Sequence, residues 1–298
     1  MAREHGTRRI EPPLPVSLDH TLDQLWRRGS DPCTGRDPDG SWWRTLRTPS
    51  GAATLRLAAD DGGVSAEAWG PGAEQALELA PEIIGASDDI TGFHPTGVLA
   101  EIHRRHPGAR IVKTHAVWHA TLLAVLEQKV AGKEALAAYV GICRAWSEPS
   151  PGPRPMLLPP AAEVIAELPY FELSRFGVER RRSETLRRLA ARARELEALG
   201  LRDARAYLER FPGVGPWTSA EIARVALGDA DALSVGDYNL PHLVAVNLTG
   251  EPRGDDAQML ALLAPYAGHR GRAQRLLEVG GRPAPRFGPR RRLRSWHR

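Results

Sequence analysis

The chain has 298 residues, 42% of them hydrophobic, which is enough to bury a core as one large or two smaller domains. It holds no run of about 18 apolar residues, and its polar start has no apolar signal stretch, so we expect neither a membrane span nor secretion. Cys33 and Cys143 are too few for a four-thiolate iron–sulfur or zinc site, so we expect reduced thiols, no metal and no cofactor.

The two signs of charge are separated along the chain. Residues 1–100 carry 9 Lys or Arg against 15 Asp or Glu, whereas residues 101–298 carry 31 against 21. A composition with 37 Arg and 3 Lys explains the choice of basic residue but not this separation. The basic C-terminal two thirds indicate a polyanionic partner.

The first 90 residues alternate between helical and strand patterns. Residues 1–12 are expected to be disordered, and a short helix is expected around Leu22, Leu25 and Trp26. Turn signals separate three β-rich runs, and a helical pattern follows at 72–84. Residues 13–90 are therefore predicted to form an α+β domain with an antiparallel sheet, whose strands are Ser41–Arg47, Ala52–Ala59 and Gly63–Trp69.

Residues 91–281 are predicted to be helical throughout, so the fold class is mainly α with an N-terminal α+β part. A proline-rich loop, Ser147–Pro160, interrupts this body, and the arginine-rich residues 282–298 are expected to form a flexible basic tail. The expected helices are 96–106, 114–131, 133–147, 160–168, 179–199, 203–210, 216–227, 238–248 and 255–264.

A glycine-rich hairpin is predicted between two of these helices, at residues 211–215. Pro216 suits the first position of the second helix, because no N–H is needed there. Gly213 and Gly215 permit positive φ and a close approach of the backbone to a ligand. The free N–H groups at the start of the second helix suit a phosphate, although the same sequence also fits a plain tight turn between helices.

An aspartate follows the hairpin at a suggestive distance. Asp237 lies about twenty residues beyond it, at an expected helix start, with Pro241 still in the first turn. Capping of the helix is the common role of such a residue. The combination of a glycine hairpin, a helix, a short loop and an aspartate is much more specific than any of these features alone.

Residues 211–241 resemble the helix-hairpin-helix DNA glycosylase superfamily (the HhH-GPD group), and the chain is most similar to its 3-methyladenine DNA glycosylase II branch. That branch adds an N-terminal antiparallel α+β domain and places a glutamine inside an upstream apolar helix, which Gln128 matches. The resemblance implies a helical glycosylase body in which Asp237 is the catalytic carboxylate. It also implies base excision repair of damaged bases, alkylated purines first.

The resemblance further implies a monofunctional enzyme. Bifunctional members place a nucleophilic lysine two residues after the second hairpin glycine, whereas this chain has Trp217. Water is then the expected nucleophile. The iron–sulfur cluster of some relatives is excluded by the two cysteines.

The same resemblance places the remaining site residues. Trp217 and Tyr238 are expected either to wall the base pocket or to pack in the core. The family often has an aromatic residue where this chain has Glu221, which either attracts a cationic base or is a solvated charge. The full expected sets are Trp217, Tyr238, Gln128, Glu221 and His269 for the base pocket, and Gly213, Val214, Gly215, Thr218 and Lys129 for DNA binding.

The expected partner is double-stranded DNA with one damaged base flipped out of the stack. The protein is expected to be a monomer in the bacterial cytoplasm, associated with the nucleoid. A non-catalytic helix-hairpin-helix clamp is the alternative function. His115 and His119 are spaced by one helical turn, but packing or capping is favoured over a metal site because no third ligand accompanies them.

Overall fold

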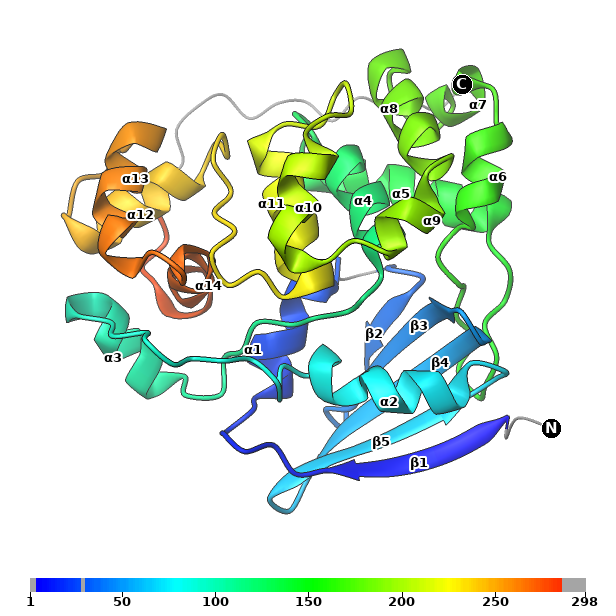
Figure 1. Cartoon of the computed structure of the whole chain (residues 1–298), viewed down its shortest axis with the longest axis horizontal. Coiled ribbons are helices and arrows are strands. Elements are labelled where there is room, and N and C mark those ends of the chain that lie inside the picture. Colours follow the sequence, from blue (N-terminus) through cyan, green and yellow to red (C-terminus); the bar gives the residue numbers. More distant parts are fainter. Residues whose placement is uncertain (1–3, 28–29, 286–298) are drawn as a thin grey trace.

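A computed structural model describes residues 4–27 and 30–285 of the chain. A sheet with one helix on its face forms the lower part in Figure 1, and a body of helices forms the upper part. The predicted class, mainly helical with a small antiparallel sheet, is confirmed. The basic tail was predicted at 282–298, and most of it lies outside the described residues.

The sheet has five strands in the order β1-β5-β4-β3-β2, and all of its pairs are antiparallel. Its three central strands are those predicted, joined by two tight hairpins as the turn residues indicated. Inward and outward side chains alternate along β5, so one face can pack on a helix. The strands are β1 (His5–Ile10), β2 (Thr34–Arg36), β3 (Trp42–Thr48), β4 (Gly51–Asp60) and β5 (Gly63–Trp69).

The prediction that residues 1–12 are disordered is wrong for the part that forms β1. This strand pairs with β5 from His5 to Ile10, and Arg9 forms an ion pair with Asp60 across the sheet. Only Ile10 of the strand is buried, because β1 is an edge strand with polar side chains on both sides. Its sequence therefore lacks the apolar alternation by which a strand is recognised.

Two helices, α1 and α2, pack against the sheet. α2 (Ala73–Ile83) packs on β1, β4 and β5, as Figure 1 shows, and confirms the helical pattern expected at 72–84. The expected short N-terminal helix is α1 (Leu18–Leu22), continued by a 3-10 turn to Leu25. Ser17 caps α1 through a bond that its hydroxyl accepts from His20 N.

The set of helices departs from the prediction in three places. The helix predicted at 179–199 breaks into α8 (Arg180–Ala190) and α9 (Ala193–Glu197), and neither α7 (Tyr170–Ser174) nor α14 (Arg270–Gly280) was among the expected helices. The buried face of α14 includes Arg272, Gln274 and Arg275, so its apolar periodicity is weak. The helices are α3 (Gly97–Arg105), α4 (Val117–Glu127), α5 (Gly132–Trp146), α6 (Ala162–Glu167), α7 (Tyr170–Ser174), α8 (Arg180–Ala190), α9 (Ala193–Glu197), α10 (Leu201–Leu208), α11 (Pro216–Ile222), α12 (Leu240–Leu248), α13 (Asp256–Leu263) and α14 (Arg270–Gly280).

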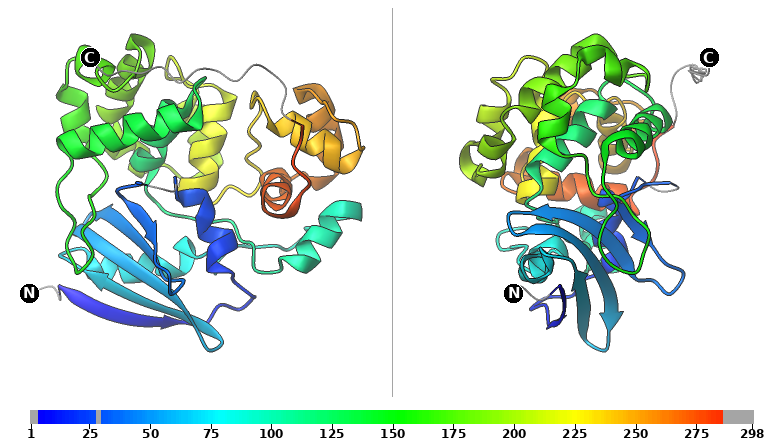
Figure 2. Two further views of the ribbon diagram at one scale, coloured as in Figure 1. Left: turned by 180° about the vertical axis from the view of Figure 1, so that it is seen from behind. Right: turned by 90° about the vertical axis from the view of Figure 1, so that its right-hand side faces the viewer.

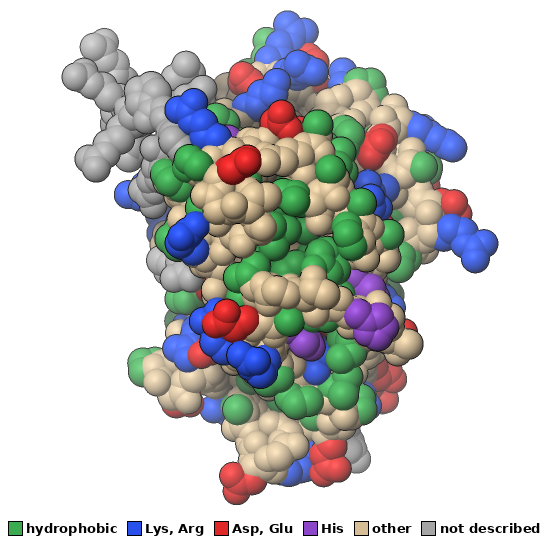
Figure 3. Space-filling view, turned by 90° about the vertical axis from the view of Figure 1, so that its left-hand side faces the viewer, with side chains coloured by type: hydrophobic (Ala, Val, Ile, Leu, Met, Phe, Trp, Pro, Cys, Tyr) green, Lys and Arg blue, Asp and Glu red, His purple; other side chains and the backbone are tan. Residues whose placement is uncertain are grey.

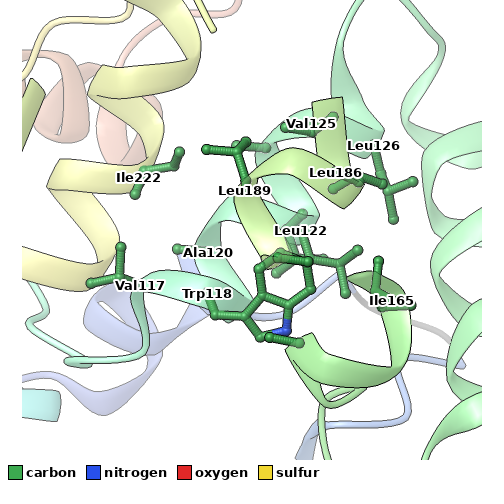
Figure 4. Close-up of a cluster of buried hydrophobic side chains, with 14 of the residues drawn as sticks. Val117, Trp118, Ala120, Leu122, Val125, Leu126, Ile165, Leu186, Leu189 and Ile222 are labelled. Carbon is green, nitrogen blue, oxygen red and sulfur yellow. The ribbon is translucent and has the colours of Figure 1, made fainter. Parts of the chain in front are cut away.

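Three hydrophobic cores hold the molecule together. One lies between the sheet, α1 and α2, a second surrounds α4, and a third joins α3 to α12, α13 and α14. In the second core Trp118 lies among aliphatic side chains of α4, α6 and α8, with Ile222 of α11 at its edge (Figure 4). Its indole N–H donates to Pro160 O at 2.9 Å. The helical body therefore consists of two packed units.

The proline-rich segment predicted as a loop, Ser147–Pro160, connects the helical body to the sheet. Its carbonyls accept hydrogen bonds from Thr45 Oγ1, Arg47 Nε and Thr54 Oγ1, at 2.7, 2.6 and 2.5 Å. Proline has no N–H to satisfy, so a chain rich in it can offer carbonyls without leaving donors buried. The sheet is thereby fixed against the helices, as both views of Figure 2 show.

None of the helices in the described part of the chain has the length and apolar content that a membrane span requires. The end of the molecule that carries α3, α12 and α13 shows hydrophobic side chains along its middle, with charges of both signs toward its edges (Figure 3). Cys33 and Cys143 are free and buried in the core around α4.

Candidate active site and hairpin

The predicted hairpin joins α10 to α11 and depends on Gly213. Its φ is +97°, a conformation that favours glycine. A Cβ atom at Gly213 would lie 2.2 Å from Thr185 Oγ1, so the residue also allows α8 to pack closely. At Gly215 φ is −116°, and no atom of the described residues lies within 4 Å of the position of an added Cβ. The space beside the Gly215 backbone is therefore open.

Gln128 fastens this hairpin to the end of α4. Its Nε2 donates to Gly213 O at 2.9 Å and to Thr218 Oγ1 at 2.8 Å. The prediction that Gln128 lies inside a helix is wrong, because α4 ends at Glu127 and Gln128 is its C-cap. Its amide hydrogens are used by the hairpin, and its place in the base pocket stays a prediction.

The surface that the hairpin offers is mostly backbone. The Val214 side chain is buried in the core, and Thr218 is buried with its hydroxyl bound to Gln128. Their predicted DNA contacts therefore remain predictions for the backbone of the hairpin. The first helical bond of α11 runs from Ser219 N to Gly215 O, so the N–H groups before it point out of the helix. Lys129 is exposed beside the hairpin, with φ +55°.

Asp237 is held by three donors. Its Oδ2 accepts from Trp217 Nε1 at 3.1 Å, and its Oδ1 accepts from the backbone N–H groups of Asn239 and Leu240 at 2.7 and 2.8 Å. These two residues open α12, so the carboxylate does cap a helix as its position suggested. The side chain is half-buried, which leaves it open to a ligand on one side.

Glu221 lies one turn beyond Trp217 on α11 and is neither solvated nor in an aromatic setting. Both of its oxygens accept from Arg224 Nη2, at 3.0 and 2.9 Å, and Oε1 also accepts from Ser234 Oγ. Burial raises the pKa of the Glu221 carboxyl, but the charge of Arg224 and these bonds bring it below its ordinary value. Glu221 is therefore a buried carboxylate.

This ion pair extends into a network that spans all three cores. Arg224 Nη1 contacts Gln24 Oε1 at 3.3 Å, and Arg27 Nε donates to Glu127 Oε1 at 2.6 Å beside it. Gln274 of α14 donates to Ser234 Oγ and to Glu278 and accepts from Ser234 N. Ser234 O in turn accepts from Asp237 N at 3.2 Å. The loop that carries Asp237 is thus fixed by the network around Glu221.

Some known proteins are similar to this chain in part of their sequence, and others are similar to it in fold. No protein-family model matches the chain. The "probable bifunctional transcriptional activator/DNA repair enzyme AlkA" of Mycobacterium tuberculosis is 29% identical over 170 residues, which are 55% of this chain and 32% of that relative. The chain therefore spans about a third of the length of the curated relatives it matches.

The solved structures match over almost the whole chain. A 3-methyladenine DNA glycosylase from Archaeoglobus fulgidus superposes with a TM-score of 0.78 at 16% identity, over 91% of this chain and 97% of that one. The Clostridium acetobutylicum 8-oxoguanine glycosylase/lyase in complex with double-stranded DNA gives 0.65 at 12% identity, over 89% and 91%. The chain has the fold of the helix-hairpin-helix DNA glycosylases.

Two further residues predicted for the base pocket are Tyr238 and His269. The Tyr238 side chain is 65% exposed and meets His242 edge-on, so it does not pack in the core, and its place in the base pocket stays a prediction. His269 binds Thr91 O through Nε2 at 3.0 Å and packs on Phe93, outside the network of Glu221. α14 reaches the site through other residues of the same helix, Gln274 and Glu278.

Sequence patterns alone hardly indicate the residues that complete the network. Glu221 and Arg224 are three apart on one helix, a spacing at which opposite charges meet. Gln24 and Arg27 come from the N-terminal part of the chain and Gln274 from its end, so only the fold brings them together. In the described part of the chain, no group of three His, Cys, Asp or Glu residues is arranged to hold a metal ion.

The two hairpin glycines should respond differently to the same substitution. Gly213→Ala places a Cβ against Thr185 at a positive φ, so we expect the free energy of unfolding to fall by about 1–3 kcal/mol. Gly215→Ala should stay within about 0.5 kcal/mol of wild type, because its backbone is extended and its surroundings are open. Urea unfolding of both variants measures this, and equal losses would contradict the assignment.

Proposed function

We propose that this protein is a monofunctional DNA glycosylase that hydrolyses the N-glycosidic bond of damaged bases, with Asp237 as its catalytic carboxylate. The observation that carries the proposal is the placement of Asp237. Its carboxylate is oriented by Trp217 and by the start of α12, in the fold of DNA glycosylases and on the loop that follows the hairpin helix. A purely structural cap would not need the indole of Trp217 on its second oxygen.

The names of similar proteins support a role in DNA repair. The M. tuberculosis relative is called a DNA repair enzyme, and the structural neighbours are DNA glycosylases, one of them bound to double-stranded DNA. The match covers only 32% of that relative, so its other activities carry no weight for this chain. We infer action on duplex DNA as a monomer, in the bacterial cytoplasm.

The reaction requires stabilisation of positive charge at C1′. As the C1′–N bond breaks, its electron pair goes to the departing base, and the sugar becomes like an oxocarbenium ion. An alkylated base that carries a positive charge leaves neutral. Water then adds its oxygen to C1′ and loses a proton, which Asp237 can accept before solvent takes it. Because the carboxylate is already held in position before the reaction, it stabilises that cation without having to reorganise during the step.

The hairpin supplies the grip on DNA. The outward N–H groups at the start of α11 and the open backbone at Gly215 suit a phosphate, and Lys129 lies beside them. Such contacts hold the DNA backbone without reading sequence, which suits an enzyme that searches for damage. The target base must leave the stack to reach Asp237, at a cost that damage lowers.

Asp237→Asn tests the catalytic assignment. The amide keeps the size and accepts from the same backbone N–H groups, but it removes the charge that faces the sugar. We expect single-turnover release of bases from methylated genomic DNA to fall by at least about a hundredfold, with affinity for undamaged duplex largely kept. Release at the wild-type rate would reject this mechanism, and no release by either protein would favour a non-catalytic DNA clamp.

The absence of a nucleophilic lysine predicts that no covalent intermediate forms. Strand cleavage by a bifunctional enzyme requires an amine that adds to C1′ and forms an imine. Trp217 occupies that position, and its indole is bonded to Asp237. Borohydride added during turnover should therefore trap no protein–DNA adduct, and nicks should appear only after alkali. A trapped adduct would show that Lys129 or another amine reaches the sugar.

Binding to undamaged duplex tests the hairpin. Gly215→Ala should lower affinity because its methyl group separates the backbone from a phosphate, while stability stays the same. Wild-type affinity should also fall steeply between about 50 and 200 mM salt, as phosphate contacts release counterions. Fluorescence anisotropy measures both effects. Binding by Gly215→Ala that equals wild type at every salt concentration would remove the hairpin from the interface.

A further inference from the structure

A small cavity lies between the N-terminal segment, the end of α4 and α11. Its volume is about 20 Å³, room for about one water molecule and far less than a base needs. Four of its lining side chains are charged, and no aromatic ring is among the residues that line it. The lining residues are Gln24, Leu25, Arg27, Arg44, Ala120, Leu123, Ala124, Glu127, Glu221 and Val225.

Arg44 is the most buried charge of this lining, with only 5% of the residue exposed. Its Nη1 donates to Thr34 Oγ1 at 3.2 Å and its Nη2 to His119 Nδ1 at 3.3 Å. Burial, with the charge of Arg44, lowers the pKa of His119 well below its ordinary value, so the ring is neutral. Its Nδ1 accepts from Arg44, which leaves Nε2–H to donate to Tyr139 OH at 2.7 Å.

Arg44 therefore carries a buried positive charge whose hydrogen-bond partners are neutral. Among the described residues, no carboxylate forms an ion pair with it, and its Nε is buried without a hydrogen-bond partner. Burial lowers the pKa of the Arg44 guanidinium, which measures how poorly its charge is compensated. A buried donor without an acceptor costs free energy, so this position favours a ligand that brings one.

The other charged residues of the lining are more exposed than Arg44, and one of them lies on the helix that orients Asp237. Glu221 is 17% exposed at its side chain and belongs to α11, which carries Trp217 one turn earlier. Arg27 and Glu127 form an ion pair whose side chains are 23% and 24% exposed, and this pair forms the rim. Glu221 thus connects the cavity that contains Arg44 to the helix that orients Asp237. Entry of a base into this cavity requires the Arg27–Glu127 pair to separate.

We propose that this cavity, once widened, is the base-recognition site and that it selects 6-oxopurines, such as alkylated guanine or hypoxanthine, over adenine derivatives. The inference rests on the proposed glycosylase function. A purine whose glycosidic nitrogen lies near Asp237 presents its C6 substituent at the far end, against Arg44. A guanidinium only donates, so it accepts an oxo group there and rejects an amino group. Glu221 is placed to accept the adjoining N1–H of a 6-oxopurine.

The test compares two bases released from one sample of DNA methylated with dimethyl sulfate. Freed 7-methylguanine and 3-methyladenine are separated by chromatography, and each rate is divided by the spontaneous rate in the same DNA. We expect wild type to accelerate 7-methylguanine release more than 3-methyladenine release. It should also excise hypoxanthine from a synthetic duplex. Equal or greater acceleration for 3-methyladenine would overturn the proposal.

Arg44→Met should lower the ratio of 7-methylguanine to 3-methyladenine acceleration by about tenfold or more, which is the scale of one hydrogen bond to a charged donor. Arg44→Lys should give an intermediate ratio. Both bases come from the same tube, so the ratio does not depend on how much of a variant is folded. An unchanged ratio in Arg44→Met would overturn the proposal.

A matched control is Asp88→Asn, which breaks another buried ion pair outside the cavity. The side chains of Asp88 and Arg272 are each 4% exposed. This variant should melt at a lower temperature and keep the wild-type ratio; a changed ratio would show that general loss of stability alters selectivity. If wild type releases neither base, the proposed function fails as a whole. If it releases 3-methyladenine preferentially, the function stands and only this inference falls.

Discussion

The ion pair between Glu221 and Arg224 is the interaction around which the site is built. It lies where the three hydrophobic cores meet, and its partners come from the N-terminal segment, α4, α11 and α14. A buried charge is stable only when it is paired and hydrogen-bonded, so each of these segments has to reach the same point. The loop that carries Asp237 is attached to this network through Ser234, and its position therefore depends on the packing of the whole molecule.

Well-packed hydrophobic residues in place of a buried ion pair often make a protein more stable. A cluster as polar as that around Glu221, Arg224 and Arg27 therefore indicates a use other than stability. The Arg44 guanidinium, enclosed with neutral partners, supports the same view. Where other glycosylases of this group are expected to present aromatic faces to a cationic base, this chain presents charged hydrogen-bonding groups.

The hairpin and the active site are mechanically connected. Gln128 binds Gly213 O and Thr218, and Trp217, the residue before Thr218, donates to Asp237. The helix proposed to meet a phosphate at its start thus also orients the carboxylate proposed to be catalytic. In the proposed function, contact with the DNA backbone and alignment of Asp237 with the sugar are set by one short helix.

The sequence by itself determined the local features. The three central strands, α2, the hairpin, the cap at Asp237 and the absence of a lysine at Trp217 follow from periodicity, turn residues and spacing within about thirty residues. The tertiary structure alone decided the rest. It placed β1 at a polar edge, ended α4 before Gln128, buried Glu221, and brought Arg44 and Gln24 to the same site. Several of these contacts join residues far apart in the chain, such as Gln24 and Arg224, which are 200 positions apart. No local pattern encodes them, because what selects them is the need to compensate buried charge in the folded chain.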